Sequence, residues 1–311
     1  MAKTQVLVVG AVNMDIGGVP LGPLVQKDSN PGRVRLSLGG VGRNIAHNLS
    51  LFGLDVSLIT AFGEDLYAQK IAASCAALGI DTAASLQVPG GATSTYLFIA
   101  DGGGDMALAV SDMEIYENLT PAVLSQRREL LEQAALVVLD TNLPADTLRW
   151  IGETIKVPIF ADPVSTAKAG KLTPILGKLH TLKPNRLEAE LLSGVPITDE
   201  ASLEKAAARL LDTGLRRVFI SLGDDGVYAA DHSSAVHLPI CPAKVVNATG
   251  CGDAFMAALC WAYLQNLDLS AAARAGTAAA ALTMEGEETI NPILSSGAVL
   301  RRMNETGGQE P

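Results

Sequence analysis

The stretch VLVVGAVNMD, residues 6–15, decides the fold. It opens with a short run of apolar, mostly β-branched residues, which is typical of a strand buried on both faces. The run stops at Asn13 and Asp15, and it has neither the cleavage site of a signal peptide nor the length needed to span a bilayer. It is therefore predicted to be the first buried strand of a sheet.

Similar runs recur along the chain and alternate with segments of helical spacing. The strand-like runs are QVLVVGAV, DVSLITAFG, ALVVLD, VPIFADP, KLHTLKP and RRVFISLG. The segments between them include GRNIAHNLSLFG, YAQKIAASCAALG, LEAELLSG and SLEKAAARLLDTG. Strands buried on both faces that alternate with helices predict an α/β fold with a doubly wound, mainly parallel sheet.

Two segments break this alternation. Residues 14–38 are rich in Gly and Pro, and residues 92–112 contain two strand-like runs around a Gly-rich turn at residues 101–105. We expect both segments to form a small antiparallel β lid over a site, at one edge of a single domain that spans residues 1–311. The tail after Arg302 is expected to be disordered.

Composition limits the classes of function. The chain has 311 residues, of which 48% are hydrophobic and 18% charged, as in a globular protein. A net charge of −10 argues against a nucleic-acid partner but allows a small anion bound with a metal ion. The four cysteines form no CxxC and have no His at zinc spacing, which indicates reduced thiols in a cytoplasmic protein without a membrane segment: Cys75, Cys241, Cys251 and Cys260.

The stretch VNATGCGDAF, residues 246–255, carries the strongest chemical signal. A strand-like KVV precedes it and the helical FMAALCWAYLQ follows, so Gly250 and Gly252 are predicted to lie in the turn that opens a helix. Free N–H groups and the helix dipole in a first turn bind phosphate or a developing anion. Asp253 could then take a proton from an attacking hydroxyl. The alternative is an ordinary Gly-rich loop with an Asp cap.

Two further stretches suit a polyhydroxylated ligand. Asn13 and Asp15 follow the first strand, where the crevice of an open α/β sheet binds ligands, and an amide with a carboxylate suits vicinal hydroxyls. In LGGVGRNIAHN, Gly40 lets the backbone approach a ligand closely and Asn44 can hydrogen-bond to it. Capping or turn chemistry is the alternative for both stretches.

In LKPNRLEAELL, Asn185 and Glu188 are one turn apart at a helix start, which suits water-mediated Mg²⁺ binding or, alternatively, helix capping. No GxxxxGK[ST] is present, and VVGAVNMD lacks the GxGxxG of a dinucleotide fold, which weakens an assignment as an oxidoreductase. GxVNxD, GGxGxN, KPNxxE, SLGxxG and xxTGxGD instead occur in the order and at the approximate spacings of one known group. Over nearly its whole length the sequence resembles the PfkB/ribokinase family of carbohydrate and nucleoside kinases.

This resemblance implies an ATP- and Mg²⁺-dependent kinase with a ribokinase-like fold and a specific set of site residues. Asp253 would be the base, and the amides of residues 248–252, including Gly250, Cys251 and Gly252, would form the anion hole. The resemblance assigns Asn185 and Glu188 to Mg²⁺ and the ATP phosphates, Ser221, Gly223, Gly226, Thr249 and Asn291 to the nucleotide site, and Asn13, Asp15, Gly40 and Asn44 to the sugar.

The late motif departs from the family at two positions. Asn247 stands where the family has Asp, a residue tied to a monovalent-cation site in many members, so activation by K⁺ is called into question. Cys251 replaces Ala and is small enough for the loop. Its thiol pKa is expected to be lowered by the helix N-terminus, although a role as nucleophile is not expected.

The acceptor is suggested by residues outside these motifs. VSDMEIYE and ADPVSTAKA, together with GGVGRN and VNATGCGD, are most similar to the branch of the family that phosphorylates the 5′-hydroxyl of pseudouridine. Thr95, Ser111 and Asp112 would offer donors and acceptors to the base, although Asp112 could instead cap a turn. The resemblance also implies a homodimer that pairs through the lid. A kinase for ribose, another sugar or another nucleoside, and a catalytically silent ligand-binding relative, remain the alternatives.

Overall fold

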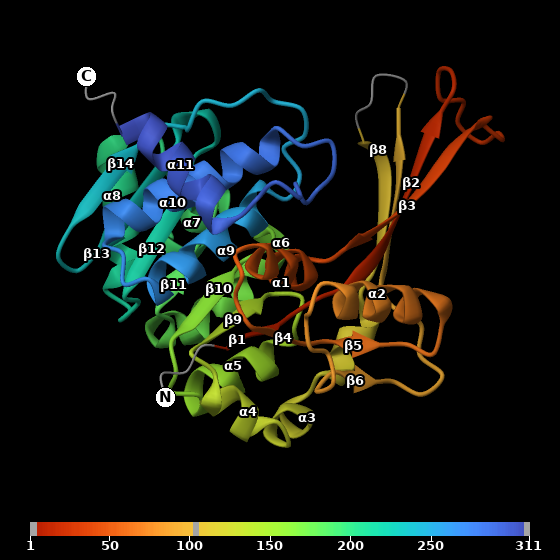
Figure 1. Cartoon of the computed structure of the whole chain (residues 1–311), viewed down its shortest axis with the longest axis horizontal. Helices are drawn as coiled ribbons and strands as arrows, with labels where there is room; N and C mark the ends of the chain where they lie inside the picture. Colours follow the sequence, from red (N-terminus) through yellow and green to blue (C-terminus); the bar gives the residue numbers. More distant parts are fainter. Residues whose placement is uncertain (1–4, 102–105, 308–311) are drawn as a thin grey trace.

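The computed structural model describes residues 5–101 and 106–307, and its centre is an eight-stranded sheet (Figure 1). The strand order is β14-β13-β12-β11-β10-β9-β1-β4. All neighbours pair in parallel except β12–β13 and β13–β14, which confirms the doubly wound, mainly parallel sheet. Each of the six strand-like runs contains one strand of this sheet. The bounds are β1 (Val6–Val9), β4 (Val56–Ile59), β9 (Leu136–Asp140), β10 (Ile159–Asp162), β11 (Thr181–Leu182), β12 (Arg217–Ser221), β13 (Val227–Asp231) and β14 (Ala235–Leu238).

Helices cover both faces of the sheet because its strands are apolar on both sides. Val6 and Val8 pack into a core with α1 (Val41–Leu51), α2 (Leu66–Ala77), α9 (Cys251–Leu264), α10 (Leu269–Met284) and α11 (Ser296–Gly307). Leu7 and Val9 face the other core, which is covered by η1 (Glu114–Asn118), α3 (Pro121–Ser125), α4 (Arg128–Gln133), α5 (Ala145–Thr154), α6 (Thr166–Ala169), η2 (Gly170–Lys178), α7 (Arg186–Ser193) and α8 (Glu200–Leu211). The short elements η3 (Gly223–Asp225), β5 (Ala61–Phe62) and β6 (Leu86–Gln87) complete the fold.

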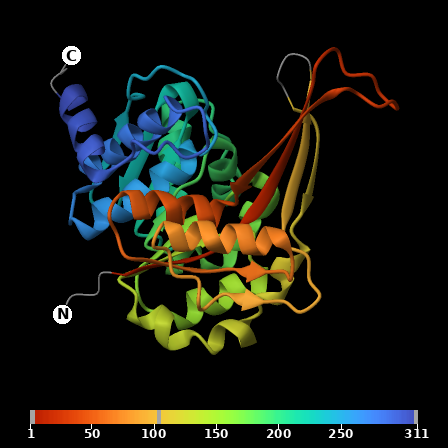
Figure 2. The ribbon, with the colours of Figure 1, turned by 45° about the vertical axis from the view of Figure 1, so that its right-hand side comes forward.

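A second sheet, hereafter the lid sheet, projects from the body of the molecule (Figures 1 and 2). It contains β2 (Asn13–Pro20), β3 (Gly32–Gly39), β7 (Thr95–Ala100) and β8 (Met106–Asp112) in the order β3-β2-β7-β8. The expectation of a purely antiparallel sheet was wrong, because the central β2–β7 pair is parallel. Met14 N–H donates to the Ser94 carbonyl at 3.0 Å, so both strands leave the body side by side in one direction. The β7–β8 turn at residues 102–105 lies outside the described residues.

Two local expectations were also wrong. KVV is not a strand: Val246 N–H and Asn247 N–H both donate to the Met284 carbonyl at the end of α10, so this backbone is satisfied without a strand partner. The segment after Arg302 is helical to Gly307, and the rest of the tail, residues 308–311, lies outside the described residues. Arg302 anchors α11 through a 3.0 Å ion pair with Glu285, while Val299 is buried in the core.

The topology brings the carboxyl ends of six parallel strands to one edge of the sheet: β1, β4, β9, β10, β11 and β12. The chain passes from β1 through α1 to β4 on one side, whereas β9 lies on the other side of β1, so the strand order reverses there. Ligands of open α/β sheets bind outside the carboxyl ends of strands at such a switch point. Across the described residues, no helix is both long and apolar enough to cross a membrane.

Candidate active site

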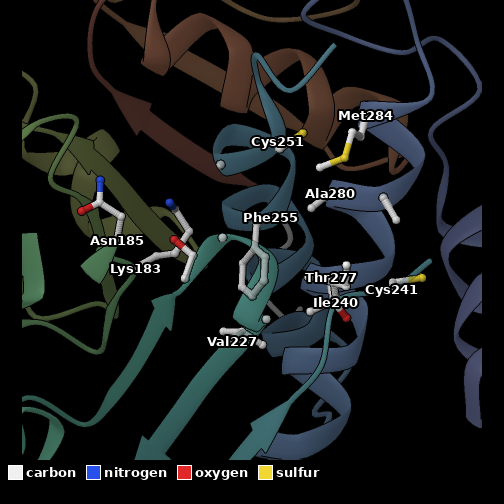
Figure 3. Close-up of a pocket in the computed structure, with 15 residues that line it drawn as sticks. Lys183, Asn185, Val227, Ile240, Cys241, Cys251, Phe255, Thr277, Ala280 and Met284 are labelled. Carbon is white, nitrogen blue, oxygen red and sulfur yellow. The ribbon is translucent and has the colours of Figure 1, made fainter. Parts of the chain in front are cut away.

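A cavity of about 340 Å³ opens at the carboxyl edge of the sheet (Figure 3). Its polar side is built by the residues that follow β11 and β12 and by the first turn of α9. It brings together six residues that the sequence assigns to the catalytic and nucleotide sites: Asn185, Ser221, Gly223, Gly226, Cys251 and Gly252. Three separate motifs of the sequence, KPNxxE, SLGxxG and xxTGxGD, therefore converge on a single cavity.

The other side of the cavity is an apolar wall that the motifs did not reveal. Phe255, Val227, Ile240, Ala280 and Met284 contribute to it from α9, β13, the segment after β14, and α10. Figure 3 shows the Phe255 ring between Lys183 on one side and Ala280 and Met284 on the other. An apolar wall next to a polar edge suits an aromatic base attached to charged groups.

The first turn of α9 requires glycine at its N-cap. Gly250 has φ +85°, and a Cβ there would lie 2.1 Å from the Thr289 carbonyl oxygen. Cys251 follows at the edge of the cavity, and the expectation of a lowered thiol pKa was wrong. Burial, with the nearby Asp253 carboxylate, raises the pKa of Cys251 to about 11, so loss of hydration and like charge outweigh the helix dipole.

Asp253, the third residue of α9, is 9% exposed. Asn44 Nδ2 donates a 2.9 Å hydrogen bond to its Oδ2, which joins the GGVGRN and NATGCGD motifs across the sheet edge. Burial raises the pKa of Asp253 to about 7, helped by the Asp162 charge, while the Asn44 hydrogen bond and the Lys183 charge oppose the rise. A carboxyl with a pKa near neutrality can exchange a proton under ordinary conditions, as a general base must.

Asn44 is held by a tight approach between α1 and the end of β1. Gly40, the N-cap of α1, has φ +97°, and a Cβ there would lie 2.5 Å from the Ala11 carbonyl oxygen. Asn44 Oδ1 is buried and has no hydrogen-bond partner among the described residues. Because a buried acceptor without a partner is costly, this oxygen is available to a hydroxyl of a bound ligand.

Asn13 and Asp15 form a second polar pair, at the start of β2. Asn13 Nδ2 donates to Asp15 Oδ1, and the Asp15 carboxylate lies against Gly39, where an added Cβ would be 2.2 Å from Oδ2. Burial raises the pKa of Asp15 to about 6, opposed by the Arg43 charge and the Asn13 hydrogen bond. An amide with a carboxylate at the start of β2 is the pattern that suits the vicinal hydroxyls of a sugar.

Asn185 and Glu188 form a reciprocal capping box at the start of α7. Asn185 N–H donates to Glu188 Oε2 and Glu188 N–H donates to Asn185 Oδ1, both at 2.9 Å, which is the capping alternative of the sequence. The bond from Asn185 N–H uses only one carboxylate oxygen of Glu188. Glu188 is 3% exposed. Burial, with the Asp162 charge, raises the pKa of Glu188, so a cation nearby would stabilise its ionised form.

The charge balance around Glu188 fits a magnesium ion that is held mainly by substrate phosphates. Within the described part of the chain, no three His, Cys, Asp or Glu side chains form a ready-made metal cluster. Mg²⁺ commonly uses one or two carboxylates, waters and the phosphates of its substrate instead of an all-protein cage. Glu188, which faces the charge of Asp162, is suited to that arrangement.

Two residues assigned to the nucleotide site do not line this cavity. Thr249 is exposed, and its N–H donates to Asn247 Oδ1 at 2.9 Å. Asn291 is buried behind α10, where its Nδ2 donates to the Leu282 carbonyl at 2.6 Å. Both therefore support the backbone near the cavity through local hydrogen bonds.

The three assigned lid residues lie together at the base of the lid sheet. Thr95 of β7 pairs with Asp112 of β8, and Ser111 pairs with Tyr96. Asp112 Oδ1 accepts a 3.4 Å hydrogen bond from Glu114 N–H at the start of η1. This is the turn-capping role that the sequence offered as an alternative for Asp112. Ser111 and Asp112 are exposed, whereas Thr95 is half-buried.

The sequence reasoning missed a buried ion pair at the same edge of the sheet. Lys183 follows β11 and Asp162 ends β10, and their Nζ and Oδ2 atoms lie 3.2 Å apart. Lys183 also lines the cavity, beside Gly252. Both residues stand in quoted motifs, KPN and ADP, but only the pairing of β10 with β11 brings them together.

Comparisons with known proteins agree with this geometry. Residues 3–296 match the family model described as pfkB family carbohydrate kinase. The chain is 38% identical over 301 residues to the pseudouridine kinase of Escherichia coli K12, covering 96% of both chains. It is also 38% identical over 296 residues to an uncharacterized sugar kinase of the same strain, covering 94% of this chain and 82% of that protein.

A solved structure gives the fold independently. The ribokinase of Thermotoga maritima superposes with a TM-score of 0.87 at 24% identity, covering 97% of this chain and 99% of that one. The architecture is therefore ribokinase-like, with a mainly parallel central sheet.

Proposed function

The chain belongs to the pfkB family of carbohydrate kinases, and from this premise we propose that it transfers the γ-phosphoryl group of MgATP to the 5′-hydroxyl of pseudouridine. Kinase activity toward a small sugar or nucleoside follows from the family, as does the expectation of ATP. The single observation that carries the proposal is the placement of Asp253. It lies in the first turn of α9, next to the cavity-lining Gly252, and its carboxylate accepts a hydrogen bond from Asn44.

The proposed chemistry divides between the two sides of Asp253. On the acceptor side, Asp253 takes the hydroxyl proton as the oxygen attacks phosphorus, and the new O–P bond forms while the bond to the ADP oxygen breaks. On the nucleotide side, the amides at the start of α9, including those of Cys251 and Gly252, hold the transferring group. Magnesium bound with ATP near Glu188 would neutralise phosphate charge.

Pseudouridine is proposed as acceptor on two grounds. The chain covers nearly the full length of the Escherichia coli pseudouridine kinase, and its own lid places Thr95 and Asp112 opposite each other, near the start of β2. These polar groups can meet a base that has two N–H donors and two carbonyls. The equal identity to a sugar kinase favours one alternative, a sugar as acceptor.

We also propose that two copies pair through the lid sheet. Its strands expose apolar side chains that a monomer would leave in water, including Val34 and Leu36 on β3 and Leu108 and Val110 on β8. Contiguous exposed apolar surface commonly marks an interaction site. Sedimentation at micromolar concentration should therefore show a dimer. A result with only monomer would contradict this proposal.

The first test is ADP release from MgATP with pseudouridine, uridine, adenosine, ribose and fructose 6-phosphate, with Asp253→Ala as the control. We expect preference for pseudouridine, and a loss of about 10²–10⁴ in kcat in the variant. Preference for another acceptor would keep the kinase and overturn the assigned substrate. No turnover with any acceptor, together with intact nucleotide binding, would favour a catalytically silent relative.

A further inference from the structure

We propose that Lys183 is the cationic residue that contacts the phosphoryl groups of the bound nucleotide, and that Asp162 is the residue that positions it. The proposal rests on the proposed kinase function and adds a charged partner to the backbone amides of α9. Those amides supply only partial positive charge, whereas phosphoryl transfer gathers negative charge over several oxygens.

Lys183 is placed where such contact is possible. It lines the nucleotide cavity although it is only 6% exposed, so its charged end is sheltered from bulk water. A Cβ built on Gly252 would lie 3.3 Å from Lys183 Nζ, which puts the ammonium group next to the first turn of α9 and one residue from Asp253. In Figure 3 Lys183 and Asn185 stand on one side of the cavity, opposite the apolar wall.

Lys183 stands among several carboxylates. Asp162 forms the ion pair at 3.2 Å, and Glu188 and Asp253 lie within electrostatic reach of the ammonium group. One lysine thus faces three carboxylates, so its single positive charge leaves a net negative charge around it. A magnesium ion that entered with ATP would take part of that negative charge and leave Lys183 for the phosphates.

Asp162 is held by its own loop in a way that fixes Lys183. Its Oδ1 accepts a 2.8 Å bond from Val164 N–H, while its Oδ2 takes the ammonium group. Val164 has φ +64°, a conformation that is strained for a β-branched residue. Strained backbone that the surrounding fold maintains is found most often at functional sites. The loop therefore orients one carboxylate oxygen toward Lys183 at a conformational cost.

A purely structural ion pair is the competing explanation, and it makes a different prediction. A buried pair that only supports the fold would, when broken, lower stability and weaken every ligand of the site alike. A phosphate contact would weaken only ligands that carry the phosphates. The ratio of affinities for a nucleoside triphosphate and for its nucleoside separates the two explanations.

The test measures binding first, because binding does not depend on the acceptor. Isothermal titration calorimetry would measure the affinity of two ligands: the Mg²⁺ complex of a non-hydrolysable ATP analogue, and adenosine alone. Each ligand would be titrated into the wild type, Lys183→Met and Lys183→Arg. We expect Lys183→Met to weaken the analogue at least tenfold more than adenosine, and Lys183→Arg to recover part of the loss. Lys178→Met, an exposed lysine at the end of η2, is the matched control and should change neither affinity.

The kinetic arm uses whichever acceptor the wild type phosphorylates. Lys183→Met should lower kcat by about 10²–10³, as loss of one donor to a developing anion does, with the acceptor KM within threefold. Asp162→Asn should lower kcat less, because the ammonium group remains. Equal weakening of adenosine and analogue, or a wild-type kcat in Lys183→Met, would overturn the proposal. Inactivity of the wild type would refute the kinase function and still leave the binding ratio as the test of Lys183.

Discussion

The raised pKa of Asp253 predicts the acid limb of the pH–rate profile. Burial and the Asp162 charge bring this pKa to about 7, and only the ionised carboxylate can accept a proton. About half of the enzyme is therefore competent at pH 7, and roughly one tenth is at pH 6. We expect kcat/KM for the acceptor, at saturating MgATP, to fall about tenfold for each pH unit below the limb.

A second variant assigns this limb to Asp253. Terminal phosphates titrate in the same range, so the limb of the wild type alone is ambiguous. Asp162→Asn removes the charge that raises the pKa of Asp253 and frees Lys183, whose charge lowers it, so both changes act in one direction. The limb should move to lower pH in this variant, whereas titration of the nucleotide would not move.

The assay is coupled ADP release between pH 5.5 and 9, with a check that the coupling enzymes are not limiting at any pH. Asp253→Ala is the baseline, because its residual rate should lack the limb. A limb that stays at the same pH in Asp162→Asn, or that persists in Asp253→Ala, would refute the assignment of the base. A wild-type limb near pH 4 would show that the burial of Asp253 is relieved before the reaction.

Three further predictions concern neighbouring features. The pKa of Asp253 is raised in the folded state, so Asp253 stabilises the fold at low pH and loses that contribution as pH rises from about 4 through 7. In calorimetry, the Tm of Asp253→Asn should therefore exceed that of the wild type by an amount that grows from pH 5 to pH 8. A difference in Tm that shrinks over this range would contradict a raised pKa of the Asp253 carboxyl. Asp15→Ala should weaken acceptor binding at least tenfold more than ATP binding in titrations; equal losses would remove Asp15 from the sugar site. Gly250→Ala should lower kcat at least 10²-fold, because its Cβ would clash with the Thr289 carbonyl and shift the amides, whereas full activity would show that the turn adapts.

The alternation of apolar runs and helical segments predicted the main sheet correctly. Every strand-like run of the central domain is a strand because its side chains are apolar on both faces, as in Val6 to Val9. KVV failed as a strand although its residues are β-branched. Val245 and Val246 are exposed, and the nearest backbone acceptor is the end of α10. Local propensity does not tell whether a partner strand is within reach.

The motifs located Asn185, Ser221 and Cys251 in the cavity, but not the hydrogen bonds or protonation states of the site residues. Asn185 and Glu188 were recognised by spacing, yet only the structure shows that they cap one another. The thiol of Cys251 illustrates the same limit, because the helix dipole is local and visible in sequence, whereas burial and the nearby Asp253 charge are not. These opposing effects can be weighed only when distances between chain segments are known.

The sequence by itself determined the alternating fold and the order of the chemical motifs, because periodicity and spacing are properties of neighbouring residues. Tertiary structure alone decided the apolar wall around Phe255, the hydrogen bond from Asn44 to Asp253 and the pairing of Lys183 with Asp162. Asn44 and Asp253 are 209 positions apart in the chain. Burial and charge act through space, so the pKa that suits Asp253 to its proposed role arises only after the sheet brings those segments together.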